Sequence, residues 1–301
     1  MKQAVPFIIL AAAGALTGCG SSSGVSPESG TSSSSSSSGG GSSGSSSGGT
    51  SATVPGIYCG RFTPASSSGA FTGSSPSTGK AGFGSCLTTG SVFFGLVEES
   101  GNAMFGSKNG TGIVVYAPSS ALSVSGSAFS VPYTAYGVNG AKANGSATAS
   151  GTLTGTVSAS HSLSGSLSNA TAGEGTFTAS YSANDWNRAA SLTTIAGTYT
   201  TSFGAAGKTI SPTLTIDSSG TISSTGGCTI SGTVSVPDGT HNAYEFKSVV
   251  ADCAAGSTFN GVGSYFPSGL VNPEGILSKP VIKLGLVDGA NTGLFLTLVK
   301  K

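Results

Sequence analysis

The stretch ATASGTLTGTVSASHSLSGSLS, residues 147–168, alternates apolar and polar side chains with a period of two. Ser and Thr fill its even positions. Its large apolar side chains all occupy odd positions, namely Leu153, Val157, Leu163 and Leu167. Such a long alternation is typical of half-buried antiparallel strands and not of a helix, whose period is 3.6. A break near Ser160 and His161 predicts that the stretch forms a β-hairpin.

Similar strands bounded by turn residues follow one another from about residue 53 to the carboxyl end, as in GIYCGRFT, VFFGLVEE, GTGIVVYA, SAFSVPYTAY and GLFLTLV. This regular spacing of short strands is typical of β-sandwiches and small β-barrels. We therefore expect an all-β protein built of antiparallel sheets, with barrel and sandwich both open for each domain.

The segment SANDWNRAASL breaks this pattern. Asn184 or Asp185 can cap a single helical turn, and Trp186, the one Trp of the chain, lies in it. We read this turn as the joint between two β domains, residues 53–188 and 189–301, and we expect Trp186 to pack there rather than to bind a ligand.

The amino end has the features of a targeting signal. Lys2 precedes an apolar run, AVPFIILAAAGAL, that is too short to span a bilayer as a helix, and small residues follow. The four residues LTGC, 16–19, resemble the bacterial lipobox. The resemblance implies removal of residues 1–18 and lipidation of Cys19, and Gly20 after the cysteine implies sorting to the outer membrane of a Gram-negative cell.

Residues 20–52 are nearly pure Ser and Gly. Such a segment cannot bury enough apolar surface to offset the entropy lost on ordering, so residues 19–52 are expected to form a disordered tether behind the lipid. A coil of this length spans roughly 30 Å. The tether alone therefore predicts that the folded part is held off the membrane.

Charge excludes two classes of partner. Only 8% of the residues are charged, and removal of Lys2 with the signal reduces 12 basic side chains to 11, against 11 acidic ones. Binding to nucleic acid, or electrostatic binding to an anionic membrane, requires clustered basic residues. We expect neither, so membrane attachment depends on the lipid at Cys19.

Four cysteines remain beside Cys19, an even number that predicts disulfides in an exported protein. Three pairings are possible. The pairing that keeps each bridge within one domain joins Cys59 to Cys86 and Cys228 to Cys253. A thiolate metal site would need a C-x-x-C pair or His at ligand spacing, which these cysteines lack, so we expect no metal and no other cofactor.

The second half carries an ordered set of motifs: GTY, LTIDSSGT, GCTISGTV, HNAYEF and a second Cys. This order resembles the C-terminal region of a group of proteobacterial lipoproteins to which no activity is assigned. The first half is similar to the same group more loosely, through GIYCGRF and VFFGLVEESGNAMFGS. The resemblance implies an exported, lipid-anchored β protein.

The motifs of catalysis are incomplete. The nucleophile elbow G-x-S-x-G occurs only within the Ser/Gly tether, as GSSSG, and both histidines, His161 and His241, lie in turn-like contexts. The stretch GAAGKT, 204–209, has Ser202 where a phosphate-binding loop needs Gly, so a hairpin turn is expected there.

The acidic residues do not indicate catalysis either. Glu98 and Glu99 are expected in a turn that faces no other acid, which disfavours a glycosidase. Asp217 in IDSSGT is expected to form an Asx turn rather than a calcium loop. We therefore expect no enzyme.

Three hypotheses for function remain. The first is a non-catalytic binding module for a protein or glycan. Four aromatic side chains are its candidate contact points, with core packing as the alternative that we favour for them, namely Tyr133, Tyr136, Tyr265 and Phe266. The second is a structural or accessory envelope lipoprotein that docks on another outer-membrane component through an open sheet edge. The third, a membrane-spanning barrel, is disfavoured because the aromatic residues are too few for two girdles.

Overall fold

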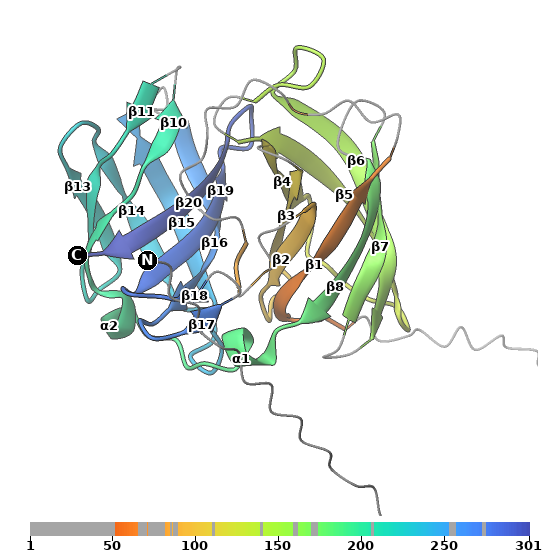
Figure 1. Cartoon of the computed structure of the whole chain (residues 1–301), viewed down its shortest axis with the longest axis horizontal. Helices are drawn as coiled ribbons and strands as arrows, with labels where there is room; N and C mark the ends of the chain where they lie inside the picture. Colours follow the sequence, from red (N-terminus) through yellow and green to blue (C-terminus); the bar gives the residue numbers. More distant parts are fainter. Residues whose placement is uncertain are drawn as a thin grey trace, which may run out of the picture. The chain divides into compact units, whose positions relative to one another are not determined.

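The computed structural model describes residues 52–65, 71, 82–84, 86, 90–109, 112–138, 141–158, 162–169, 174–205, 208–252, 257–272 and 275–301. The main sheets of this part of the chain are two closed, eight-stranded antiparallel barrels (Figure 1). The prediction of two antiparallel β domains is thus confirmed, and both are barrels. The signal peptide, Cys19, nearly all of the tether, His161 and Cys253 lie outside the described residues.

Barrel 1 is an up-and-down meander in which each strand pairs with the next and β8 returns to β1. Its strands are β1 (Gly56–Pro64), β2 (Val92–Val97), β3 (Ala103–Asn109), β4 (Gly112–Pro118), β5 (Ala128–Gly137), β6 (Thr148–Ser158), β7 (Ser162–Asn169) and β8 (Gly175–Tyr181). The predicted hairpin is β6–β7, in which Ser158 pairs with Ser162. The structure joins Cys59 of β1 to Cys86, as the pairing within one domain predicts, with their Cα atoms 5.0 Å apart.

Two short helices connect the barrels, α1 (Ala183–Trp186) and α2 (Leu192–Ile195). The predicted helical turn is α1, but the predicted cap is wrong, because Ser182 holds the N-cap position and Asn184 and Asp185 lie inside the helix. Helix α2 was not expected. Its N-cap, Ser191, accepts a hydrogen bond from the Thr194 amide through its hydroxyl, which satisfies one free donor of the first turn.

Barrel 2 closes in the order β12-β13-β14-β15-β16-β19-β20-β9. Its strands are β9 (Gly197–Thr200), β12 (Thr213–Ile216), β13 (Thr221–Thr225), β14 (Ile230–Ser235), β15 (Tyr244–Ala251), β16 (Ser257–Phe266), β19 (Val281–Val287) and β20 (Gly293–Lys300). Cys228, before β14, is disulfide-bonded. Because Cys253 lies outside the described residues, its pairing with Cys228 stays a prediction.

Two ribbons of two strands are inserted into barrel 2. The first is β10 (Phe203–Ala205) with β11 (Lys208–Ile210), between β9 and β12. The second is β17 (Val271–Asn272) with β18 (Gly275–Ile276), between β16 and β19. The stretch GAAGKT therefore belongs to a hairpin, as its sequence predicts.

The inward faces of both barrels are apolar. In β6, Leu153 and Val157 point into the core of barrel 1, whereas Thr154 and Thr156 lie on the outer face and share hydrogen bonds with Ser166 and Ser164 of β7. A membrane-spanning barrel has the opposite arrangement, with apolar side chains outside.

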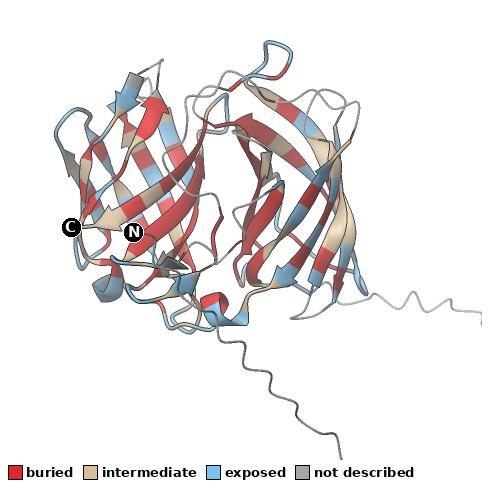
Figure 2. Cartoon of the chain, in the orientation of Figure 1, coloured by how far each residue is buried: buried red, intermediate tan, exposed pale blue. Residues whose placement is uncertain are grey.

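A third core cluster lies where the barrels meet. Strand β2 contributes Phe93 to the interior of barrel 1 but Phe94, on its outer face, to the third cluster, which also contains Phe295 of β20. The Phe94 and Phe295 rings are 5.1 Å apart, and Phe83 contacts both. Strands β2 and β19 are consequently buried on both faces, which Figure 2 shows as nearly continuous red. Trp186, 2% exposed, belongs to this cluster, so its predicted packing role is confirmed.

Candidate functional site

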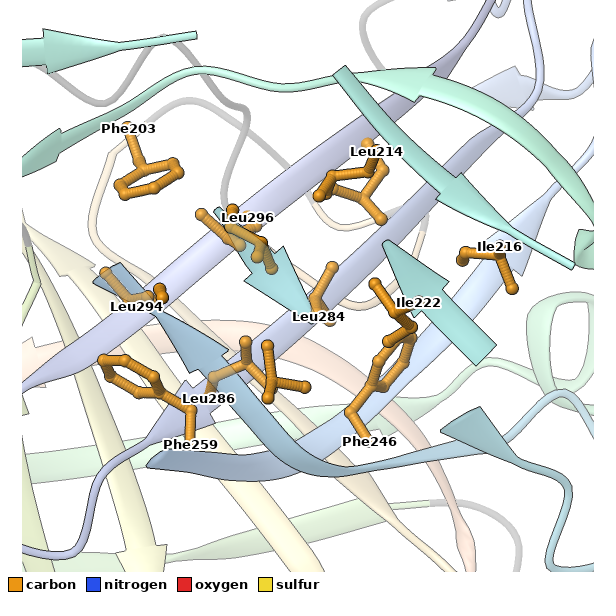
Figure 3. Close-up of a pocket in the computed structure, with 14 residues that line it drawn as sticks. Phe203, Leu214, Ile216, Ile222, Phe246, Phe259, Leu284, Leu286, Leu294 and Leu296 are labelled. Carbon is orange, nitrogen blue, oxygen red and sulfur yellow. The ribbon is translucent and has the colours of Figure 1, made fainter. Parts of the chain in front are cut away.

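The interior of a closed barrel is the first place to look for a ligand. Barrel 2 contains a cavity of about 30 Å³ lined only by apolar side chains, among them Phe246, Phe259 and Leu284 (Figure 3). Apolar cavities that bind benzene measure about 150 Å³. Eight strands enclose a space that side chains nearly fill. The cavity is therefore a small packing void and not a site for an organic ligand.

The four aromatic side chains considered as contact points are not exposed. Tyr133, Tyr136 and Phe266 are buried, at 2%, 3% and 2% exposure, and Tyr265 is half-buried against the core of barrel 2. Burial therefore agrees with the core-packing alternative for the first three residues and removes them as contact points, and Tyr265 is mainly a packing residue as well.

The reason differs between the two tyrosines of β5. Tyr133 follows Phe129 and Val131 at intervals of two, so it points into barrel 1 with them. Tyr136 has the opposite parity, but barrel 2 covers it: a methyl side chain at Gly293 would lie 2.6 Å from the Tyr136 Cβ. Parity in the sequence could have identified Tyr133 as a core residue, whereas only the contact between the barrels buries Tyr136.

A groove of about 320 Å³ lies between the barrels, and we call it the inter-barrel groove. Its volume is at the lower end of the range of small-ligand sites, about 300–1,000 Å³. Barrel 1 contributes Asn102, Ala103, Met104, Ala117 and Pro118, and barrel 2 contributes Glu245, Phe246, Lys247, Ser248, Asn260, Gly261 and Val287.

A β-bulge shapes the barrel 2 side of the groove. The register of β15 against β16 shifts between Phe246 and Val249, and Ser248 adopts a φ of 50°. The Ser248 amide donates a hydrogen bond of 3.0 Å to Asn260 Oδ1, which holds this left-handed conformation. Bulges and positive φ values at non-glycine residues concentrate at functional sites, where they redirect side chains.

A buried carboxylate lies next to the groove. Glu98, in the turn after β2, is only 2% exposed. Its Oε2 accepts a hydrogen bond of 3.3 Å from Nδ2 of the Asn102 side chain, and Asn102 lines the groove. Its Oε1 is buried and has no hydrogen-bond partner among the described residues. Burial, reinforced by repulsion from Glu245 across the groove, raises the pKa of Glu98 to about 7. The expectation that the turn at Glu98 faces no other acid is therefore wrong.

Its neighbour Glu99 contacts His241 of barrel 2. Glu99 Oε1 lies 2.6 Å from His241 Nδ1, and Asp238 Oδ2 lies 3.6 Å from the same nitrogen. The three groups lie within 4.8 Å of one another, close enough to be considered for a metal. However, 2.6 Å is shorter than the roughly 3 Å that separates two ligands of one zinc ion. The geometry is that of a direct contact between a carboxylate and an imidazole from different barrels, and the His241 ring stacks on Trp186 with the ring centroids 4.8 Å apart.

His241 Nδ1 contacts both Glu99 Oε1 and the hydroxyl of Thr240, the latter at 3.0 Å. In a hydrolase triad the acid holds Nδ1 and the nucleophile lies at Nε2. These contacts of His241 concern Nδ1 alone and do not complete a triad. Asp217 forms the expected Asx turn, because its Oδ1 accepts hydrogen bonds from the amides of Ser219 and Thr221. The hydrogen bond from the Ser219 hydroxyl to the same oxygen, followed by those from the amides, lowers the pKa of this exposed carboxyl.

The residues of the groove come from segments far apart in the sequence, which is why sequence reasoning missed them. One usable signal was present: VFFGLV is apolar without alternation, which is typical of a strand buried on both faces.

Comparison of the chain with protein-family models, with curated proteins and with solved structures gives no match.

Proposed function

We propose that the chain is a lipid-anchored, non-catalytic binding protein of the outer membrane of a Gram-negative bacterium, and that its protein or glycan ligand occupies the inter-barrel groove. The groove is the observation that carries this proposal, because it is concave and joins polar groups from both barrels. The barrel 2 cavity is too small to compete with it.

The lining of the groove suits a hydrogen-bonding segment with an apolar side. Asn102 and Asn260 offer amides, and Lys247 Nζ pairs with Glu245 Oε2 at 2.8 Å, while Ala103, Met104 and Val287 supply apolar surface. Peptides and glycans combine polar edges with apolar faces in this way.

The structural or accessory hypothesis includes docking through an open sheet edge, and the barrels do not favour this form of it. Both main sheets are closed, so neither barrel offers an open edge on which a partner strand could dock. An accessory lipoprotein would dock through side chains or through the edge of one of the two-stranded ribbons, β10–β11 or β17–β18. An accessory lipoprotein would also use the inter-barrel groove, so the identity of the component bound there distinguishes the two hypotheses.

The anchor is proposed from the sequence, through LTGC and Gly20. No helix in the described part of the chain is long and apolar enough to cross a bilayer. Cys19→Ser should abolish labelling of the mature protein by radioactive fatty acid and release the chain from membranes, whereas Ser22→Ala should change neither. Membrane retention and labelling of the Cys19→Ser chain would refute the anchor.

The groove is tested by filling it. Ala117→Trp places a large side chain in the groove, and Ser119→Trp, two residues further along on exposed backbone, is the matched control. We would isolate the full chain from envelopes in mild detergent and identify the proteins and glycans that co-purify. Ala117→Trp should reduce the bound component about tenfold or more, and the control should retain it. Equal recovery from both variants would exclude the groove as the site.

The source of the ligand depends on which side of the outer membrane the barrels face. An epitope placed after Lys301 would be followed during protease treatment of intact and permeabilised cells. Loss of the epitope from intact cells would indicate an external ligand, and protection until permeabilisation would indicate a periplasmic one.

A further inference from the structure

The two inserted ribbons of barrel 2 have the same architecture but different surroundings. In β10–β11 the directly opposed pair is Phe203 and Ile210, which packs on the barrel 2 core, with Phe203 only 3% exposed. In β17–β18 the opposed pair is Val271 and Ile276, which are 69% and 71% exposed. Among the described residues these two are the large hydrophobic side chains that remain exposed. One ribbon therefore covers the barrel, and the other presents apolar side chains to its surroundings.

The β17–β18 ribbon is not needed to close the barrel. Strands β16 and β19 already pair directly, with Phe266 opposite Val281. Two further hydrogen bonds continue the ribbon beyond its strands, from the Gly269 amide to the Leu277 carbonyl at 2.7 Å and from the Leu277 amide to the Leu270 carbonyl at 3.0 Å. The chain thus maintains an ordered apolar projection, which natural proteins usually cover or avoid.

We propose that the β17–β18 ribbon rests in the interfacial region of the lipid bilayer, with Val271 and Ile276 among the upper acyl chains. The inference deepens the proposed function and rests on its lipid anchor. It changes the expected position of the barrels relative to the membrane. The tether alone predicts barrels held off the membrane, whereas the ribbon predicts barrels in contact with it.

Two arguments favour a bilayer over a protein partner. A stable protein complex buries more than about 1,000 Å² in total, far more than two aliphatic side chains supply. Partition into a bilayer requires no such area, because weak insertion becomes effective once a lipid and a tether spanning roughly 30 Å hold the chain beside the membrane. The side chains are uncharged, so the contact does not require anionic lipid, in keeping with the near-neutral chain.

The single Trp of the chain makes a direct measurement possible. Trp186 is 2% exposed and supplies a constant background. Val271→Trp adds a reporter to the β17–β18 ribbon, and Thr209→Trp adds one at an exposed position of the β10–β11 ribbon, which controls for the affinity of Trp itself for interfaces. The full lipidated chain would be reconstituted in phosphatidylcholine vesicles with or without brominated acyl chains. Bromines should quench the added emission of Val271→Trp about threefold through direct acyl contact, and leave that of Thr209→Trp unchanged.

A second measurement removes any influence of the introduced Trp. In the chain carrying Cys19→Ser, binding is weak and has to be measured as co-sedimentation at high lipid concentration, where the pair Val271→Ser and Ile276→Ser should lower the partition into phosphatidylcholine vesicles about tenfold. Absence of quenching in Val271→Trp, or equal quenching in both Trp variants, would overturn the proposal. A blue shift that grows with protein concentration without vesicles would also overturn it, in favour of a second copy of the chain. If native Cys19 proves unlipidated, the anchor fails, but the co-sedimentation comparison still decides whether the ribbon binds lipid.

Discussion

The β6–β7 hairpin and strand β2 belong to the same barrel, and they differ in what lies outside it. Around the hairpin the outer face is Thr and Ser in water, with Thr154 bonded to Ser166 at 3.0 Å. Around β2 the outer face is Val92, Phe94 and Leu96, covered by the third core cluster. The inward face of a barrel strand is apolar in both cases. The side chains of the outward face depend on what covers that face. Apolar and polar side chains therefore alternate in strands that face water, and this alternation disappears where two barrels meet.

The largest expected effect is at the junction of the barrels. Phe94→Ala removes a ring that contacts Phe83 and Phe295, and should lower the free energy of unfolding by about 3–5 kcal/mol. Urea denaturation followed by Trp186 fluorescence would measure it, because Trp186 lies in the same cluster. A loss below 1 kcal/mol would show that the contact between the barrels contributes little to stability.

Leu153→Ala in β6 tests the inward face of the same barrel away from the junction. The side chain is fully buried in the core of barrel 1, so its truncation should cost about 3 kcal/mol through lost burial and the cavity left behind. Circular dichroism during urea denaturation would measure the change. Comparison with Phe94→Ala shows whether the interior and the junction of the barrels contribute equally to the free energy of unfolding. A loss near zero for Leu153→Ala would contradict the inward orientation of Leu153.

Glu98 gives the junction of the barrels a pH dependence. Its pKa in the folded state is raised to about 7, whereas an unfolded Glu titrates near 4.5. The folded state therefore holds a proton that the unfolded state releases, and the free energy of unfolding should fall as pH rises from about 4.5 to about 7, and then level off. Glu98→Gln should stabilise the chain by about 1–2 kcal/mol at pH 8 and by little at pH 4.

Denaturation midpoints at both pH values would test this, with Asp252→Asn, at an exposed carboxylate, as the control. If Glu98→Gln destabilised the chain equally at both pH values, the carboxylate would be acting as a hydrogen-bond acceptor and not as a buried charge.

The smallest expected effect is on the outer face of the hairpin. Thr154→Ala removes a hydrogen bond to Ser166 that is partly exposed to water, and should change the free energy of unfolding by no more than about 0.5 kcal/mol. Thr154 directly follows Leu153, so the two variants compare the faces of one strand. A cost similar to that of Leu153→Ala would mean that the outer face of β6 is covered by something in solution.

The candidate site was largely beyond sequence reasoning. Glu98 and Glu99 were recognised as a turn, and the structure has that turn, with the Gly101 amide bonded to the Glu98 carbonyl. Their partners could not be identified, because Glu245 and His241 belong to the other barrel. Pairing between distant segments depends on how two finished barrels pack, and no local pattern encodes it. Tyr136 is buried for the same reason, because barrel 2 covers it. Tyr133 is buried because it has the same parity in β5 as the core residues Phe129 and Val131.

Local sequence patterns specify the strands, the β6–β7 hairpin, the helical joint at Trp186, the Asx turn at Asp217 and the β10–β11 hairpin. Side-chain alternation and turn chemistry within a few residues set these features. Packing between distant segments, in contrast, closes both sheets, brings Phe94 and Phe295 into one core, forms a groove beside Glu98 and leaves Val271 and Ile276 uncovered. Each of these depends on which surfaces meet after the strands have formed, and an apolar side chain has the same local pattern whether a neighbouring barrel covers it or not.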